Sequence, residues 1–177
     1  IDSKFQAEKL YVQTLRSLRI AVHADAANEQ HYELPAGFFK LVLGKNLKYS
    51  SSYWSAGCKN LDEAESAALK ITMQRAELKD GMNILELGCG WGSLTLAMAK
   101  AFPNSKIVAL SNSSSQREFI EGELKRLNLK NVRILTKNFA SDIELPSDIL
   151  PLDRVVSVEM FEHLKNYELL FNRISKW

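Results

Sequence analysis

Cysteine is scarce in this sequence, with two among 177 residues, Cys58 and Cys89. One of them lies inside a glycine-rich turn, so no disulfide framework is expected and a reducing, cytoplasmic compartment fits the composition. Histidine and cysteine are nowhere clustered with the spacing of metal ligands, so no metal site is expected. No apolar run is long enough to span a bilayer, and no secretory signal pattern is present.

An excess of charge of one sign is also lacking. The 23 basic and 21 acidic residues leave a net charge of +2, too balanced to indicate nucleic acid as a partner. The length and a hydrophobic content of 46% fit a globular chain with a sizeable core. There are no internal repeats, and no feature indicates an oligomeric state. The chain begins with Ile1 rather than Met, which suggests a piece of a longer polypeptide.

The feature around which the sequence is organised is a glycine-rich turn. Residues 84–87 form an apolar run typical of a buried parallel strand, and Gly88, Gly90 and Gly92 follow at alternate positions. Residues 93–99 then have helical spacing. A strand, a tight glycine turn and a helix N-terminus usually bind a nucleotide-like cofactor. The alternative is a turn that only packs the helix against the strand.

The identity of the cofactor depends on the details of this turn. The glycines are spaced G-x-G-x-G, and Ser93 stands where a dinucleotide fingerprint has its third glycine. The next strand ends in Ser111-Asn112-Ser113, without the carboxylate that would hold the ribose of NAD. The pattern Glu86-x-Gly88-x-Gly90-x-Gly92 instead resembles the first motif of S-adenosylmethionine-dependent methyltransferases. This resemblance implies S-adenosyl-L-methionine as the cofactor.

Strands and helices alternate along the rest of the chain. Strands are predicted over 83–87, 106–111, 132–136 and 153–158, and helices over 92–102, 115–128 and 164–176, with an earlier helix that begins after Asn60. Repeated strand–helix units predict an α/β fold with a parallel sheet and helices on both faces. The resemblance to the methyltransferases implies that this is their Rossmann-like fold. The loops at 88–92, 111–116, 137–140 and 159–163 are expected to converge at the carboxyl ends of the strands.

The length suggests one domain, and two regions of it are predicted. Residues 1–60 form an N-terminal helical extension and a segment that covers the cofactor, and residues 61–177 form the cofactor-binding core. The core is expected to be incomplete, truncated after its fourth strand, because a methyltransferase sheet of this class has seven. Within the extension, an apolar stripe (Tyr11, Leu15, Leu18 and Val22) predicts a helix over 4–22. This helix is expected to pack on the domain; the alternative is a basic amphipathic helix in peripheral contact with a membrane.

Four further segments narrow the family. Residues 30–39 resemble the His-Tyr-Asp-x-x-x-x-Phe-Phe segment of cyclopropane fatty acid synthases and their methyltransferase relatives. Residues 49–54 resemble their Tyr-Ser-x-x-Tyr-Phe/Trp segment, 111–116 their acid-free second motif, and 157–163 their Glu-His motif. Within this superfamily, the residues of these motifs resemble those of the coclaurine N-methyltransferase-like branch most. From sequence alone, the aromatic residues of 48–54 either cover a hydrophobic edge or line a pocket.

Apart from this resemblance, the chemistry of the residues suggests which part of the cofactor each would contact. Backbone N–H groups at 88–92 would meet the methionyl part, with Glu86 indirectly near its ammonium. The side chains of Ser111 and Asn112 suit ribose hydroxyls, Asn138 suits the adenine edge, and Phe139 offers a ring face. By resemblance, Tyr49 and Ser50 close over the methionyl carboxylate. The predicted cofactor-binding residues are Tyr49, Ser50, Glu86, Gly88, Gly90, Gly92, Ser111, Asn112, Gln116, Asn138 and Phe139.

The predicted catalytic residues are Glu159, Glu162 and His163, at the end of the fourth strand. An amine nucleophile must lose a proton, which a histidine can accept near neutral pH, and a carboxylate can attract a cationic amine. The alternative is that the three residues only cap the following helix. The lipid-modifying synthases usually carry Cys at the position of Ser51 and often Gly at that of Glu159, which favours an amine acceptor.

Three functions remain open at this point. The first is a methyltransferase that acts on a small amine. The second is methyl transfer to a lipid acyl chain, as in the cyclopropane fatty acid synthases. The third is a truncated, non-catalytic binding domain that retains part of the cofactor site.

Overall fold

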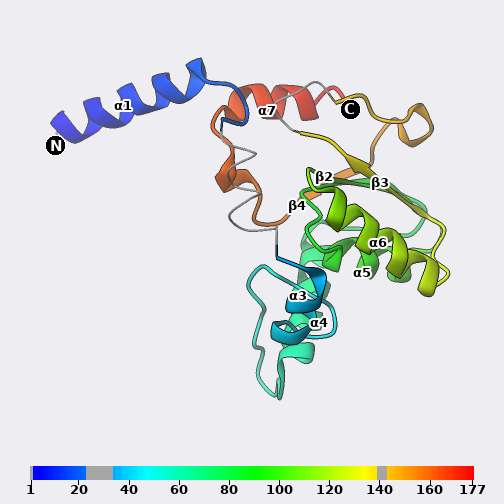
Figure 1. Cartoon of the computed structure of the whole chain (residues 1–177). Coiled ribbons are helices and arrows are strands. Elements are labelled where there is room, and N and C mark those ends of the chain that lie inside the picture. Colours follow the sequence, from blue (N-terminus) through cyan, green and yellow to red (C-terminus); the bar gives the residue numbers. More distant parts are fainter. Residues whose placement is uncertain (1, 23–33, 139–142) are drawn as a thin grey trace.

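A computed structural model describes residues 2–22, 34–138 and 143–177 (Figure 1). The helices are α1 (Asp2–Ser17), α3 (Ala36–Val42), α4 (Leu61–Arg75), α5 (Ser93–Ala101), α6 (Ser114–Arg126) and α7 (Tyr167–Ile174). The strands are β1 (Asn83–Leu87), β2 (Lys106–Ser111), β3 (Val132–Thr136) and β4 (Arg154–Ser157), and 3-10 turns lie at Ser147–Ile149 and Phe161–His163.

Within these described ranges the strands form one four-stranded sheet in the order β3-β2-β1-β4. Every neighbouring pair is parallel, with Leu85 of β1 opposite Val108 of β2 and Val155 of β4. The chain therefore builds outward from β1 to β3 and then returns to the other side of β1. This return creates a switch point between β1 and β4, where ligands bind in open α/β sheets. The predicted Rossmann-like fold is confirmed.

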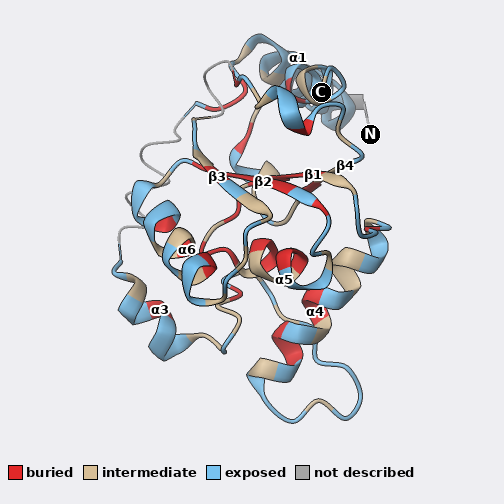
Figure 2. Ribbon diagram, turned by 90° about the vertical axis from the view of Figure 1, so that its right-hand side faces the viewer, coloured by how far each residue is buried: buried red, intermediate tan, exposed pale blue. Residues whose placement is uncertain are grey.

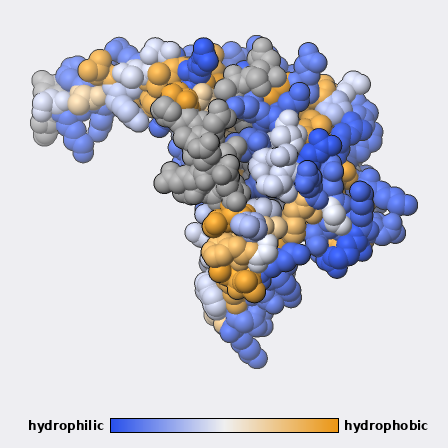
Figure 3. Space-filling model, viewed as in Figure 1, coloured by the Kyte–Doolittle hydropathy of each residue, from blue (hydrophilic) through white to orange (hydrophobic). Residues whose placement is uncertain are grey.

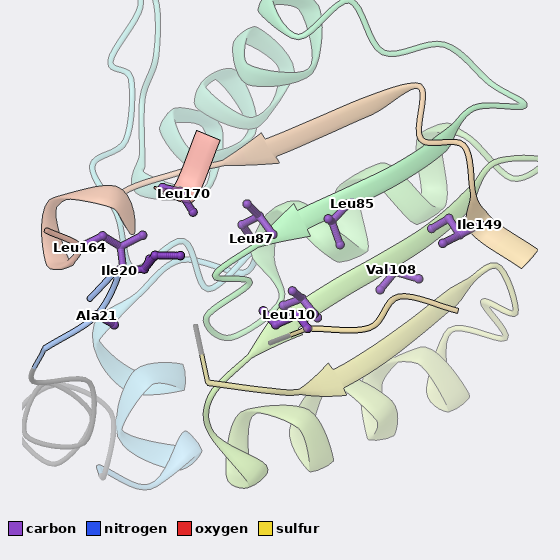
Figure 4. Packing of buried hydrophobic residues seen from close by; sticks show 10 residues of the cluster. Ile20, Ala21, Leu85, Leu87, Val108, Leu110, Ile149, Leu164 and Leu170 are labelled. Atoms are coloured by element: carbon purple, nitrogen blue, oxygen red, sulfur yellow. The ribbon is translucent and has the colours of Figure 1, made fainter. Parts of the chain in front are cut away.

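Helices cover both faces of the sheet (Figure 2). On one face α4, α5 and α6 pack against alternate strand residues such as Ile84, Ile107 and Ile134. On the other face Leu85, Leu87, Val108 and Leu110 meet Leu164, Leu170, Ile149 and the 20–21 segment (Figure 4). Because β1 and β2 are buried on both faces, their sequences are mostly apolar, and Glu86 is the charged residue that β1 buries.

The N-terminal helix differs from its prediction. It ends at Ser17 rather than residue 22 and extends away from the body, beside the start of α7 (Figure 1). Tyr11 of the predicted stripe is 60% exposed, and Ile20 and Ala21, which follow the helix, enter the core instead. Hydrophobic surface is visible on α1 and around α3 (Figure 3). Among the described helices, none has the length and apolar character needed to cross a membrane.

The last predicted helix also begins later than expected. Residues 161–163 form a 3-10 turn, and α7 starts only at Tyr167. Asn166 caps α7, because its side chain accepts a hydrogen bond from the backbone N–H of Leu169 at 3.0 Å. The same side chain donates 2.8 Å hydrogen bonds to the carbonyls of Arg16 and Leu18. A contact with residues so distant in sequence therefore sets where α7 begins.

Candidate functional site

The glycine turn connects β1 to α5 at the carboxyl edge of the sheet. The backbone N–H groups of Gly88 and Cys89 both donate to the carbonyl of Leu110, at 3.1 and 2.9 Å, and this fixes the turn to the end of β2. Gly88, Gly90 and Gly92 all have a positive φ, of 79°, 52° and 83°. Residues other than glycine are strained in this conformation, which explains why glycine stands at all three positions. The predicted glycine turn between a strand and a helix is confirmed.

The three glycines serve different purposes. A Cβ at Gly88 would lie 2.6 Å from Met160, and one at Gly92 would lie 2.7 Å from Ile120, so both positions allow close packing. A Cβ at Gly90 would meet nothing within 4 Å. Gly90 is thus the glycine whose backbone is open to a ligand, whereas Gly92 packs against α6.

A cavity of about 300 Å³ lies at this edge of the sheet. Loops after all four strands line it, together with residues 47–50 and two side chains of α4. Its volume is in the lower range of small-molecule sites. The predicted residues that line the cavity are Tyr49, Ser50, Glu86, Gly88, Gly90, Ser111, Asn112, Gln116, Asn138, Glu159, Glu162 and His163. Phe139 and the 30–33 part of the first family segment fall outside the described residues.

Several polar atoms in the wall of the cavity lack partners within the protein. In the described part of the chain, the buried side-chain atoms without a hydrogen bond are Trp91 Nε1, Ser93 Oγ and Gln116 Nε2. All three residues line the cavity. The amide oxygen of Gln116 accepts a 2.7 Å hydrogen bond from Ser111, which leaves the nitrogen of the amide for another acceptor. Buried donors are seldom left unpaired, so the wall fits a polar ligand.

Glu86 lies at the base of the cavity and is 3% exposed. Its Oε2 accepts a 2.5 Å hydrogen bond from the hydroxyl of Thr95 on α5. Burial raises the pKa of Glu86 to about 7, against the smaller lowering effect of the Thr95 hydrogen bond. Burial also raises the pKa of the Cys89 thiol, with a further contribution from the charge of Glu86. A ligand ammonium near Glu86 would compensate the cost of its buried charge.

Glu159, Glu162 and His163 lie at the exposed mouth of the cavity, just after β4. The hydroxyl of Ser157 donates to the carbonyl of Leu87 at 2.9 Å and so fixes the end of β4 to β1. Glu159 has a φ of +50°, an unusual conformation for a residue with a side chain. Such strain often occurs at functional sites. The side-chain cap of α7 is Asn166 rather than any of these three residues.

Lys48, Trp91 and Ser93 also line the cavity, although they were not among the residues predicted from the sequence. Trp91 and Ser93 could have been found from their places within the glycine turn and at the first position of the following helix. No local pattern distinguishes Lys48 from a solvated lysine, yet it is only 7% exposed. Burial lowers the pKa of Lys48, whereas the charges of Glu159 and Glu65 act to raise it. Of the aromatic residues in 48–54, Tyr49 lines the cavity, and Tyr53 and Trp54 are more than half exposed.

Comparison with known proteins gives sequence relatives and similar structures. The (S)-coclaurine N-methyltransferase of Thalictrum flavum subsp. glaucum is 43% identical over 93% of this chain and 44% of its own length. A crystal structure of coclaurine N-methyltransferase bound to N-methylheliamine and SAH matches with a TM-score of 0.91 and 38% identity, over 99% of this chain and 50% of that one.

A more distant similarity reaches the lipid-modifying enzymes. A mycolic acid cyclopropane synthase complexed with SAH and CTAB matches with a TM-score of 0.74 and 28% identity, over 89% of this chain and 53% of that one. The present chain thus spans about half the length of these relatives. The family profile of mycolic acid cyclopropane synthetase matches residues 21–177. The predicted resemblance is confirmed, and the chain belongs to the mycolic acid cyclopropane synthetase family.

Proposed function

We propose that the protein is an S-adenosylmethionine-dependent methyltransferase that methylates the nitrogen of a small amine. The observation that carries this proposal is the cavity at the carboxyl edge of the sheet. It is lined by the glycine turn and neutral polar side chains on one side and by Glu159, Glu162 and His163 at the mouth. The similarity to coclaurine N-methyltransferase over nearly the whole chain supports the same activity.

The residues present fit the cofactor. When bound, S-adenosylmethionine supplies an electrophilic methyl group on a sulfonium. Unpartnered donors on Trp91, Ser93 and Gln116 match a ligand rich in acceptors, and the open backbone at Gly90 admits close contact. Ser111 and Asn112 would hold the ribose, and Asn138 would hold the adenine edge.

The mouth of the cavity fits an amine acceptor. Two carboxylates, Glu159 and Glu162, attract a protonated amine, and His163 accepts the proton that the nitrogen must lose before it attacks. Ser51 and Glu159, two positions at which the sequence departs from the lipid-modifying synthases, contact each other. The backbone N–H of Ser51 donates to Glu159 Oε1 at 3.2 Å. The carboxylate of Glu159 is therefore held at the site by the backbone of Ser51.

Replacement of the proposed base tests this function. In the full-length protein, His163→Ala is expected to lower kcat for amine methylation by roughly 10²- to 10⁴-fold, the usual contribution of a general base. Its affinity for S-adenosylhomocysteine should stay within about twofold of the wild type, because the predicted cofactor contacts come from other loops. Labelled methyl transfer to a panel of amines measures the first quantity, and calorimetry measures the second. Unchanged turnover in the variant would remove His163 from the mechanism.

A lipid acceptor is the second candidate function. It is favoured by the similarity to a mycolic acid cyclopropane synthase and by exposed apolar side chains on α1, including Phe5, Leu10 and Tyr11. Such a helix could make peripheral contact with a membrane. Transfer of labelled methyl to phospholipid vesicles, with none to the amine panel, would favour this candidate. If the protein binds no cofactor in calorimetry, neither enzyme function is supported. The non-catalytic domain is then the remaining candidate.

A further inference from the structure

Lys48 is a buried cation in the wall of the cavity. It is 7% exposed and lies directly before the predicted cofactor contacts Tyr49 and Ser50. A lysine ammonium taken out of water is costly unless hydrogen bonds and opposite charges compensate it. Nearby residues of the same segment supply the hydrogen bonds, and two carboxylates from distant parts of the chain, Glu65 and Glu159, supply the opposite charge.

The ammonium of Lys48 organises the segment that follows it. Nζ donates a 2.5 Å hydrogen bond to the hydroxyl of Ser50 and a 2.6 Å hydrogen bond to the carbonyl of Ser51. The backbone N–H of Ser51 in turn donates to Glu159 Oε1 at 3.2 Å. Lys48 and Glu159 thus hold the same short segment from its two sides, and their charges attract each other.

The segment before Lys48 is fixed just as firmly. Glu65 of α4 is fully buried and accepts hydrogen bonds from the backbone N–H groups of Gly44, Asn46 and Lys48, at 2.9, 2.8 and 3.2 Å. Leu47, beside Lys48, has a φ of +50°. The backbone up to residue 48 is therefore held to α4, and the Lys48 side chain extends this support to residues 50 and 51.

We propose that Lys48 is a positioning residue that couples the two halves of the site. It holds residues 49–51 over the cofactor end of the cavity, and through Ser51 and its charge it holds the Glu159 carboxylate at the acceptor end. This inference rests on the proposed function for its acceptor half only. The cofactor half requires no methyl acceptor and can be tested alone.

The test replaces Lys48 by methionine, which keeps the length of the side chain and removes its charge and donors. In the full-length protein, Lys48→Met is expected to weaken S-adenosylhomocysteine binding about tenfold in calorimetry and to raise the KM for the amine about tenfold. Lys48→Arg, which keeps the charge and the donors, should recover a large part of both losses. The control is Lys45→Met, an exposed lysine of the same segment, which should leave both quantities within twofold.

A double-mutant cycle with Glu159→Gln separates positioning from a general loss of structure. If Lys48 acts through Glu159, the fold-increase in the amine KM of the double variant should be smaller than the product of the fold-increases in the two single variants. Multiplicative effects, or a Lys48→Met variant with unchanged cofactor affinity and KM, would overturn the proposal. Should Lys48→Met not fold, Lys48→Gln keeps the test open. A wild-type protein that binds S-adenosylhomocysteine but methylates no amine would refute the proposed function, and the calorimetric comparison would still decide the cofactor role of Lys48.

Discussion

Glu86 is the buried carboxylate whose ionisation the fold disfavours most clearly. Its pKa is raised by burial from 4.5 to about 7, so between these values the folded state holds a proton that the unfolded state has lost. The free energy of unfolding therefore contains a contribution that is complete below about pH 4.5 and lost as the pH rises through about 7.

This linkage predicts the behaviour of Glu86→Gln, which cannot ionise. Relative to the wild type, the variant should gain roughly 3 kcal/mol in free energy of unfolding between pH 4.5 and pH 8, since each pKa unit corresponds to about 1.4 kcal/mol. Urea unfolding of both proteins at the two pH values, without cofactor, measures the difference. Parallel pH profiles for the two proteins would show that Glu86 titrates normally in the folded state.

Most of the residues that line the cavity could be predicted from the sequence because their types carry the chemistry. Alternate glycines, a polar triplet after β2 and acids with a histidine after β4 all follow strands, and parallel strands bring their carboxyl ends to one edge. Lys48 could not be predicted, because its burial depends on Glu65 and Glu159, which lie 17 and 111 residues away along the chain. The role of Gly92 also depends on a distant contact, with Ile120 of α6.

At the scale of elements, three of the strands could be predicted at their observed bounds and the helix ends less well. These strands are rich in aliphatic residues, which makes short buried strands recognisable in a sequence even where Glu86 or Arg133 interrupts them. The start of α4 could be predicted because Asn60 is a local cap, and its side chain accepts from the backbone N–H of Glu63 at 3.0 Å. The ends of α1 and α7 could not, because Asn166 joins them through carbonyls at Arg16 and Leu18.

Helix α4 is expected to hold residues 44–48 in place through Glu65. Glu65→Gln replaces one of two acceptor oxygens by an NH₂ group, so at least one backbone N–H of residues 44–48 loses its partner in a buried place. We expect the free energy of unfolding to fall by roughly 2 kcal/mol. Urea unfolding with an unchanged m-value measures this loss. Glu118→Gln, on the exposed surface of α6, is the matched control and should lie within about 0.5 kcal/mol of the wild type; equal stability of the two variants would contradict the anchoring role of Glu65.

At the scale of the molecule, the cavity belongs to the sheet as a whole. Its lining comes from the ends of β1, β2, β3 and β4 and from the segment held by α4. A ligand that contacts all of these parts cannot bind once any of them has unfolded. Binding should therefore stabilise the entire folding unit rather than one loop.

The thermal midpoint of unfolding measures this coupling. At a free concentration of one hundred times its Kd, a ligand that binds only the folded state adds about 2.7 kcal/mol to the free energy of unfolding. For a unit of this size, this corresponds to a rise in the thermal midpoint of roughly 5–10 °C. S-adenosylhomocysteine should give this rise in a single transition. Gly90→Ala, whose Cβ would project into the open backbone face of the cavity, should reduce the rise at the same ligand concentration. Gly81→Ala, at a glycine of similar open surroundings with a φ of +89° outside the cavity lining, introduces comparable backbone strain and should keep the rise in full. Backbone strain alone should affect the two variants alike. A rise in the thermal midpoint that is kept in Gly90→Ala but lost in Gly81→Ala would therefore place the ligand elsewhere.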